Sequence, residues 1–321
     1  MTASGPSGSW PVELQAPDIE RWRAGNTRIP FFTTLDSGTD GPHVMVTAIT
    51  HGNELCGAIV LDAFLASGKR PRAGRLTLGF CNVAAYRSFD PAYPTLSRFV
   101  DEDMNRVWDR STLDGRRSSV ELARARAIRP LLDTVDMLLD IHSMANPVPP
   151  LMLAGSCDKG VALARKVGTP ASIVTDAGHA AGARMRDYGV FNDPSDPRAA
   201  LLLEAGQHWA AGTLPVAREA FDRFLVATGM LDPQDVPAAH RAAPPPQEVI
   251  QVTEAITARG RNFAFVADYL GAEKIERAGT VIAHDDGEPV VTPYDNCILI
   301  MPSRAPAPGQ TAVRLGRIVD G

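Results

Sequence analysis

A histidine and a carboxylate three residues apart follow a short apolar segment near the N-terminus. Residues 43–49 read His-Val-Met-Val-Thr-Ala-Ile, and His51 and Glu54 come soon after them. We expect 43–49 to be a buried strand and Glu54 to open a helix, which places both side chains at a strand-to-helix turn. An imidazole nitrogen and a carboxylate oxygen are ligands that Zn²⁺ accepts. The pattern predicts part of a metal site, although such a pair also arises by chance.

A candidate third ligand, His142, follows a second apolar segment. Residues 135–141 read Val-Asp-Met-Leu-Leu-Asp-Ile, and we expect a buried strand that ends at His142. The strand ends of an open α/β sheet collect ligands at one edge. Asp140 lies within this strand, where a carboxylate needs a partner, and orienting the second nitrogen of a metal-bound His142 would supply one. A hydrogen-bonded core histidine is the alternative for His142 alone.

Two further segments carry charged residues that could surround a metal. Residues 98–108 hold two arginines, three carboxylates and an asparagine, and a solvated charged loop is the alternative interpretation of this segment. Glu204 follows the apolar residues 199–203. A carboxylate delivered by a buried strand is either a paired core charge or a general base, and beside a metal the general base is favoured.

The four segments, in this order, resemble the succinylglutamate desuccinylase/aspartoacylase family, which belongs to the wider zinc carboxypeptidase-like hydrolases. The residues that carry the resemblance are His51-Gly52-Asn53-Glu54, Asp103-Met104-Asn105-Arg106, Asp140-Ile141-His142 and Glu204-Ala205-Gly206. The similarity runs from about residue 40 to the end of the chain. The ordered set is far more specific than any one of its parts.

The resemblance implies a role for each matching position. One Zn²⁺ per chain would be held by His51, Glu54 and His142. A substrate carboxylate would be bound by Asn105 and Arg106. Arg98 would polarise the scissile carbonyl, Glu204 would act as general base and acid, and we expect supporting hydrogen bonds from Asp103 and Asp140.

The sequence leaves open which residues bind the rest of the substrate. Aspartoacylases have an additional arginine shortly before the catalytic glutamate, and the candidates here are Arg184, Arg186 and Arg198. The first two are our predicted substrate ligands. Residues 176–197 are rich in Gly, Ala, Asp and Pro and predict a long loop that could fold over the cleft.

Other polar residues receive weaker assignments. Tyr294 could reach the substrate, and a half-buried turn tyrosine is at least as good an interpretation of it. His208 is expected to have a structural or supporting role. His179 and His284 lie in predicted loops without a partner pattern, and we assign them no function.

The elements that must position these groups alternate along the chain. Strands are expected at 29–34, 43–49, 75–81, 135–141, 151–154 and 199–203. Helices are expected at 54–66, 118–132, 160–167 and 215–228. This alternation predicts an α/β fold, and with the resemblance a zinc-carboxypeptidase-like catalytic domain built on a mixed sheet. Pro30 indicates an edge position for the first strand.

The last quarter of the chain has a different residue pattern. Short β-prone runs separated by Gly, Asp and Pro are found at 248–257, 261–268, 279–283, 289–292 and 297–301. We therefore expect a catalytic domain over 1–235 with a disordered tail at 1–10, a proline-rich linker over 236–247, and a smaller all-β domain over 248–321. The resemblance implies that this β-domain caps the cleft.

Composition excludes several classes of function. The chain of 321 residues has a net charge of −5 and no basic stripe, so nucleic acid is an unexpected partner. No apolar segment is long enough to cross a bilayer. The four cysteines are isolated and indicate buried thiols in a reducing compartment, which points to the cytoplasm. A homo-oligomer is compatible with the sequence.

The predicted function is a zinc-dependent amidohydrolase, a deacylase that removes a small acyl group from an N-acylated amino acid or a related amine. A metallocarboxypeptidase acting on short peptides would share every catalytic residue, and a capped cleft counts against it. A non-catalytic metal-binding relative is the third hypothesis. The presence of Glu204 and Arg98 beside all three ligands counts against that one.

Overall fold

A computed structural model describes residues 10–179 and 181–319 of the chain. Nearly all of the tail expected at 1–10 lies outside these residues. The helices in the described part are α1 (Leu55–Ser67), α2 (Val83–Tyr86), α3 (Arg110–Asp114), α4 (Val120–Leu132), α5 (Asp158–Val167), α6 (Thr213–Ala227) and α7 (Ala238–Arg241). None of them has the combined length and apolar character that crossing a bilayer requires.

The strands form one large mixed sheet and one small antiparallel sheet. The first seven strands are β1 (Phe32–Asp36), β2 (His43–Ala48), β3 (Arg75–Phe80), β4 (Met137–Met144), β5 (Leu151–Leu153), β6 (Ser172–Thr175) and β7 (Ala199–Gln207). The others are β8 (Glu248–Thr257), β9 (Phe263–Phe265), β10 (Lys274–Ile275), β11 (Val281–Asp285), β12 (Glu288–Val291), β13 (Cys297–Ile300) and β14 (Thr311–Val319). The larger sheet has the order β1-β3-β2-β4-β7-β5-β6-β8-β14-β13-β10, and the smaller one β12-β11-β9.

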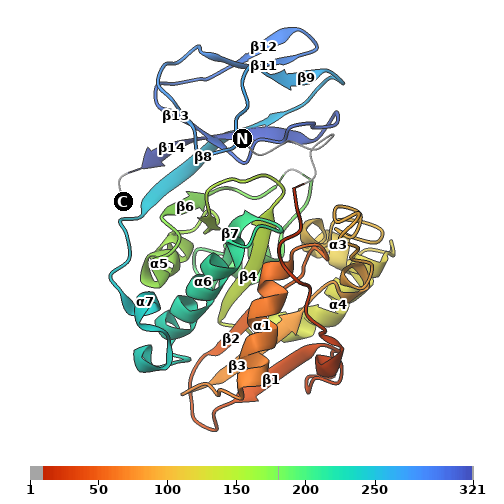
Figure 1. Ribbon diagram of the computed structural model, residues 1–321, viewed down its shortest axis with the longest axis vertical. Helices are drawn as coiled ribbons and strands as arrows, with labels where there is room; N and C mark the ends of the chain where they lie inside the picture. Colours follow the sequence, from red (N-terminus) through yellow and green to blue (C-terminus); the bar gives the residue numbers. More distant parts are fainter. Residues whose placement is uncertain (1–9, 180, 320–321) are drawn as a thin grey trace.

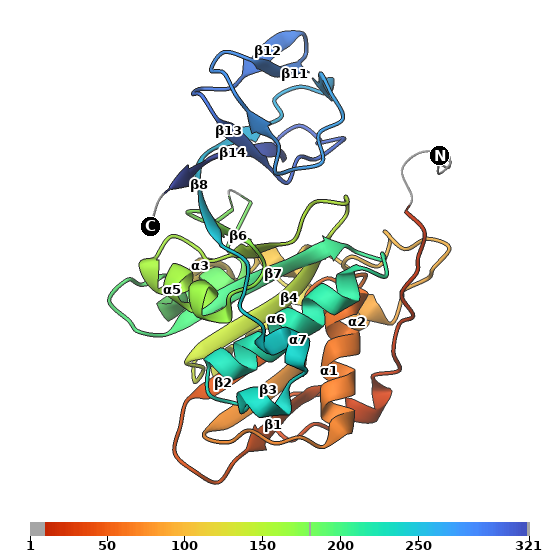
Figure 2. The same cartoon turned by 60° about the vertical axis from the view of Figure 1, so that its left-hand side comes forward.

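Helices cover both faces of the sheet in the first part of the chain (Figures 1 and 2). One core joins α1, α5 and α6 to the sheet, and a second core joins α3 and α4 to the opposite face. Successive side chains of a strand point to opposite faces, so Val44 and Val46 enter the first core and Met45 enters the second. This arrangement confirms the predicted α/β fold with a large mixed sheet.

The central strands β2, β4 and β7 run parallel to one another and extend to the site. The expected strand at 135–141 continues to Met144, and the strand expected at 199–203 continues to Gln207. His142 and Glu204 therefore lie within strands, where they are direct partners in the β4–β7 register. The prediction that they follow strand ends was wrong by a few residues, because pairing between the two strands carries them further.

The first predicted strand begins later than expected. Residues 29–31 form a turn in which Phe31 has a positive φ of 67°, and β1 begins at Phe32. As Pro30 indicated, β1 is the edge strand and pairs only with β3 in the described part of the sheet. The strands β6, β10 and β14 were not predicted, since the first two are very short and the alternation in β14 is interrupted by Arg314 and Gly316.

Residues 248–319 are all β, as predicted, but the sheet is continuous across the expected boundary. The start of β8 pairs with β6, and residues 249–257 of β8 pair with β14, so this one strand belongs to both parts (Figure 2). The expected linker at 236–247 contains the one-turn helix α7. A division into two domains at this point stays a prediction.

Candidate active site

The turn between β2 and α1 presents the first two predicted ligands. A Cβ atom at Gly52 would lie 2.4 Å from the Ala85 carbonyl carbon, so only glycine fits between His51 and Asn53. Glu54 is the residue that precedes the first turn of α1, and its side chain does not cap the helix. The Glu54 carboxylate therefore remains available to the site.

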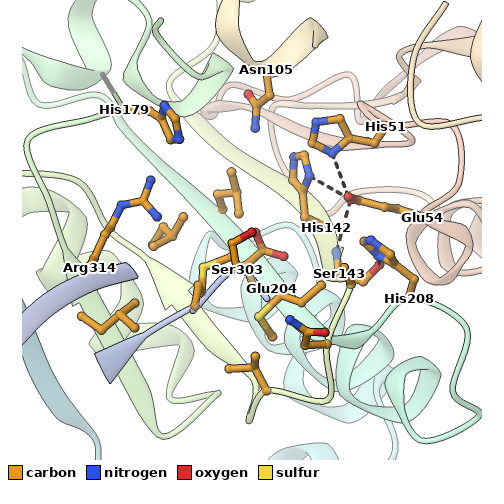
Figure 3. A pocket seen from close by; sticks show the side chains of 18 of the residues that line it. His51, Glu54, Asn105, His142, Ser143, His179, Glu204, His208, Ser303 and Arg314 are labelled. Carbon is orange, nitrogen blue, oxygen red and sulfur yellow. Dashed lines mark hydrogen bonds and ion pairs between the residues drawn. The ribbon is translucent and has the colours of Figure 1, made fainter. Parts of the chain in front are cut away.

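The three predicted metal ligands come together in the folded chain (Figure 3). His51 Nδ1 lies 2.7 Å from Glu54 Oε1, and His142 Nδ1 lies 2.9 Å from Glu54 Oε2. One ligand atom of each residue lies within 4.8 Å of the other two, and all three residues are buried. Burial opposes ionisation of Glu54, but the two imidazoles hold the pKa of its carboxyl well below the usual range. This cluster could hold a metal ion.

The other nitrogen of each imidazole faces an aspartate. His142 Nε2 lies 2.7 Å from Asp140 Oδ2, which is the contact expected from the sequence, and His51 Nε2 lies 2.9 Å from Asp103 Oδ1. The hydroxyl of Thr47 donates to Asp140 over 2.8 Å. Such contacts fix ring orientation, and both rings direct Nδ1 toward Glu54.

Arg98 lies beside the cluster, with its Nη2 2.9 Å from His51 Nε2. Its Nη2 is 3.1 Å from Asp103 Oδ2, and its Nη1 is 3.5 Å from Glu54 Oε1. Despite the cost of burial, these carboxylates raise the pKa of Arg98. Arg98 is therefore a permanent positive charge next to the three candidate ligands.

Glu204 faces the same cavity from β7. Its side chain is almost buried, with 8% of the residue exposed, and Oε2 has no hydrogen-bond partner among the described residues. Burial, together with the charge of Glu54, raises the pKa of Glu204 to about 8 against the attraction of His142. A buried carboxyl with a free oxygen can exchange protons at neutral pH, as a general base must.

These groups line one cavity of about 530 Å³. Its other walls come from segments far apart in the chain: Asn105 and Arg106, residues 143–148, Asp176 with His179 and Arg184, residues 300–305, and Arg314. The segment expected as a long loop, 176–197, contains two short 3₁₀ helices and supplies three of these residues. Residues 300–305 show that the β-rich part of the chain reaches the cavity.

The predicted substrate residues divide into two groups. Asn105, Arg106 and Arg184 line the cavity. Arg186 does not: its guanidinium donates to the backbone carbonyls of Ala154 and Ala200 at 3.0 and 3.1 Å and is fully buried there. The expected role of Arg186 is therefore not supported, because its guanidinium already binds these two carbonyls and, at 2.6 Å, Asp187 Oδ1.

Tyr294 and Arg198 also lie outside the cavity lining. The Tyr294 hydroxyl is 2.5 Å from Thr253 Oγ1, and the Arg317 guanidinium stacks on its ring at 4.4 Å. This matches the alternative interpretation of a half-buried turn tyrosine, and the expected contact with substrate is not supported. Arg198 pairs with Asp196, two residues away, at 2.8 Å.

Several cavity residues were missed or left without a role. Arg314 stands in the apolar run Ala312-Val313-Arg314-Leu315, and a lone arginine in such a run was the one signal that could have identified it. His179 lies in the cavity wall, although we assigned it nothing. His208 Nδ1 lies 2.8 Å from Ser143 Oγ, and burial lowers the pKa of His208 to about 4, which agrees with the supporting role expected for it.

The fold is similar to that of several solved structures. Succinylglutamate desuccinylase from Vibrio cholerae has a TM-score of 0.67 and 18% identity, with 88% of this chain and 83% of that chain covered. An aspartoacylase family protein from Mesorhizobium loti has a TM-score of 0.63 and 19% identity, with 90% and 89% covered. The ectoine utilization protein EutE from Ruegeria pomeroyi has a TM-score of 0.59 and 17% identity, with 90% and 88% covered.

Sequence comparison assigns the chain to a family. No curated protein sequence matches it. The family model of the succinylglutamate desuccinylase/aspartoacylase catalytic domain matches residues 40–227, which is more than half of the chain and includes all four segments that carry the predicted site. The chain belongs to the succinylglutamate desuccinylase/aspartoacylase family of hydrolases.

Proposed function

We propose that this protein is a zinc-dependent deacylase that hydrolyses the amide bond of an N-acylated amino acid or a similar small acylated amine. The observation that carries the proposal is the buried cluster of His51, Glu54 and His142, with Glu204 facing the same cavity. Membership of a hydrolase family supports the reaction type, and the donor set supports the metal.

The three ligands fit a catalytic zinc ion. Two imidazoles and one carboxylate are a donor set that Zn²⁺ uses in hydrolases, and the aspartates behind the rings hold the donors in place. When bound in such a site, zinc lowers the pKa of a coordinated water to about 7 and polarises a carbonyl.

Glu204 and Arg98 are the groups of the chain that would act on the reacting amide. As water adds to the amide carbon, Glu204 would accept its proton and then return the proton to the leaving nitrogen, so no covalent intermediate with the protein is required. Negative charge grows on the carbonyl oxygen during the addition. The fixed positive charge of Arg98, held beside the cluster by Asp103, would stabilise that charge.

Asn105 and Arg106 would anchor a carboxylate of the substrate. The Asn105 Oδ1 atom accepts the Met185 amide at 2.9 Å, which fixes the side chain and leaves its NH₂ group to donate. Burial lowers the pKa of Arg106 to about 10, so the guanidinium stays protonated at neutral pH. A planar guanidinium forms two parallel bonds with a carboxylate, which suits this role.

Two other functions are disfavoured by particular observations. A carboxypeptidase acting on peptides would need an open cleft, whereas residues 300–305 of the β-rich part form one wall of this cavity. A non-catalytic relative would gain nothing from Glu204, because a buried carboxyl without a partner costs stability. The four free, buried cysteines agree with a cytoplasmic location, which we include in the proposal.

The test is a hydrolysis assay on N-acetyl, N-formyl and N-succinyl amino acids beside short peptides, with metal-quantified protein and with or without a chelator. We expect chelator-sensitive release of a free amino acid from one acyl class. Cleavage of peptides alone would favour the carboxypeptidase. A protein that carries one zinc per chain and hydrolyses none of these compounds would contradict the proposed function.

A further inference from the structure

Glu121 is a buried carboxylate that the proposed mechanism does not use. It stands in the first turn of α4 and is fully buried. It is not among the described residues that line the cavity of the active site. A buried carboxylate is costly unless its oxygens are hydrogen-bonded, so the partners of Glu121 indicate what its charge does.

Three of these partners are successive backbone amides of one loop. Oε1 accepts from the Val100 amide at 2.6 Å, and Oε2 accepts from the amides of Asp101 and Glu102 at 3.0 and 3.3 Å. Successive amides that converge in this way form a backbone anion site, and here a side chain of the same chain fills it. Burial opposes ionisation of Glu121, but hydrogen bonds from the Val100 amide and Asn82 hold its pKa below the ordinary value.

The loop has little other support. Residues 98–103 contain no helix or strand, and the side chains of residues 99–101 are exposed, so packing against the core does not hold these three residues. Hydrogen bonds to the start of α4 hold the loop instead. Asp101 Oδ2 accepts the Val120 amide at 2.7 Å, and Glu121 accepts three amides in the opposite direction.

The two ends of this loop carry groups of the active site. Arg98 comes two residues before the first of the three amides, and Asp103 comes directly after the last. Their side chains pair at 3.1 Å, and Arg98 Nη2 also lies 2.9 Å from His51 Nε2. A shift of the backbone at residues 100–102 would therefore move the guanidinium relative to the metal cluster.

The fourth partner of Glu121 connects it to the turn that presents His51. Asn82 Nδ2 donates to Glu121 Oε1 at 3.0 Å. The backbone amide of Asn82 donates to the Ile49 carbonyl at 2.9 Å, two residues before His51. Glu121 therefore joins the loop of Arg98 to the turn of His51.

We propose that Glu121 is a positioning residue for the reaction: by holding the amides of residues 100–102, it sets the place of the Arg98 guanidinium beside the metal cluster. It acts through Arg98, since it does not line the cavity itself. This inference rests on the proposed function, in which Arg98 stabilises the charge on the carbonyl oxygen. Misplacement of such a group by about 1 Å can cost about 100-fold in rate.

Glu121→Gln tests the proposal because it changes the hydrogen bonds at constant shape. Each carboxylate oxygen accepts two bonds, so the NH₂ group of glutamine must face two donors in either orientation. At equal zinc content, we expect kcat for the hydrolysed substrate to fall about 10- to 100-fold. KM should stay nearly unchanged, because Asn105 and Arg106 are still present to anchor the substrate.

Two further variants separate positioning from a general loss of stability. Asp285→Asn is the matched control, because buried Asp285 also accepts two successive backbone amides, those of Arg259 and Gly260 at 2.8 and 2.9 Å, in the β-rich part. It should lower the unfolding free energy and leave kcat unchanged. Glu121→Asp keeps the charge and should recover part of the kcat lost in Glu121→Gln.

A double-mutant cycle shows whether Glu121 acts through Arg98. Arg98→Gln alone should lower kcat, and adding Glu121→Gln should cause little further loss, because the guanidinium to be positioned is gone. A normal kcat in Glu121→Gln, or the same fold-loss with and without Arg98, would overturn the proposal. If Glu121→Gln does not fold, Glu121→Asp is judged by the same two criteria.

Hydrogen exchange separates this inference from the proposed function. If the unmodified protein hydrolyses none of the compounds in the assay above, the proposed function fails. The inference is then judged from the exchange of the amides of residues 100–102, which needs no turnover. Faster exchange in Glu121→Gln than in both the unmodified protein and Asp285→Asn supports it, and equal exchange in the three overturns it.

Discussion

The two sides of the cavity differ in how their charged side chains are paired. On the metal side, His51, Glu54 and His142 contact one another directly, and each ring is held by an aspartate. On the arginine side, charges come from segments far apart in the chain, and two guanidiniums, Arg106 and Arg314, are left without a carboxylate partner in the described structure.

The contrast separates reaction from recognition. A metal and its base need fixed geometry. On the metal side, contacts within the protein already hold the three candidate ligands in place. On the arginine side, Arg106 and Arg314 form no ion pair among the described residues, so these two charges remain for an anion that enters the cavity. Substitutions on the metal side should therefore affect turnover or metal affinity, and those on the arginine side should affect the choice of substrate.

The largest effect is expected for Glu204→Gln. The amide keeps the shape but cannot accept a proton, so kcat should fall by about 10²- to 10⁴-fold. The variant should keep its metal content, because Glu204 is not one of the three ligands. Steady-state kinetics together with metal analysis test this, and near-normal turnover would mean that another group is the base.

Arg106→Gln should affect recognition and not the reaction. The loss of a charge-assisted bond to a substrate carboxylate corresponds to about 10- to 100-fold in kcat/KM. The effect should be in KM for substrates with a free α-carboxylate and small for their amidated analogues. An equal loss on both kinds of substrate would exclude Arg106 as the anchor.

Asp140→Asn tests how the metal side is supported. Asp140 holds His142 Nε2 at 2.7 Å, and loss of such an orienting carboxylate typically weakens metal affinity by about 10- to 100-fold. Competition with a chelator of known affinity measures the change. Unaltered affinity in a folded variant would show that β4 alone orients the ring.

The smallest effect concerns His43, a buried histidine at the far end of β2 that is no candidate ligand. Burial and the charge of Arg75 lower its pKa in the folded state. Below its ordinary pKa of about 6.5 the unfolded chain binds a proton that the folded chain does not, so the stability contributed by neutral His43 is lost as pH falls.

His43→Gln removes that titration. We therefore expect the difference in unfolding free energy between the unmodified protein and the variant to change by about 1 kcal/mol per pH unit below pH 6.5. Urea unfolding at pH 8 and pH 5.5 measures it. A difference that is constant between the two pH values would show that His43 does not titrate differently in the two states.

Much of the metal side could be predicted because its signals are local. Gly52 and the three-residue spacing of His51 and Glu54 define a turn, and apolar runs identify the strands that bring His142 and Glu204 beside it. The bounds of these strands could not be predicted as well, because pairing between neighbours extends β4 and β7 past the apolar residues.

The arginine side could not be predicted in the same way. Arg184 and Arg186 are close in sequence and look equivalent, but one faces the cavity and the other binds backbone carbonyls. Tyr294 and Arg314 both come from the β-rich part, and only Arg314 reaches the cavity. Which side of a strand or turn faces the cavity depends on partners distant in the chain.

The sequence by itself determined the family, the α/β class and the residues that can hold a metal, because short-range spacing and periodic burial encode them. Only the tertiary structure decided which arginines are neutralised and which are free. Ion pairs depend on the distance between side chains from separate segments, and no local pattern records that distance. Asp176 neutralises Arg184, whereas Arg314, brought in by β14, lines the cavity and forms no ion pair within the described residues.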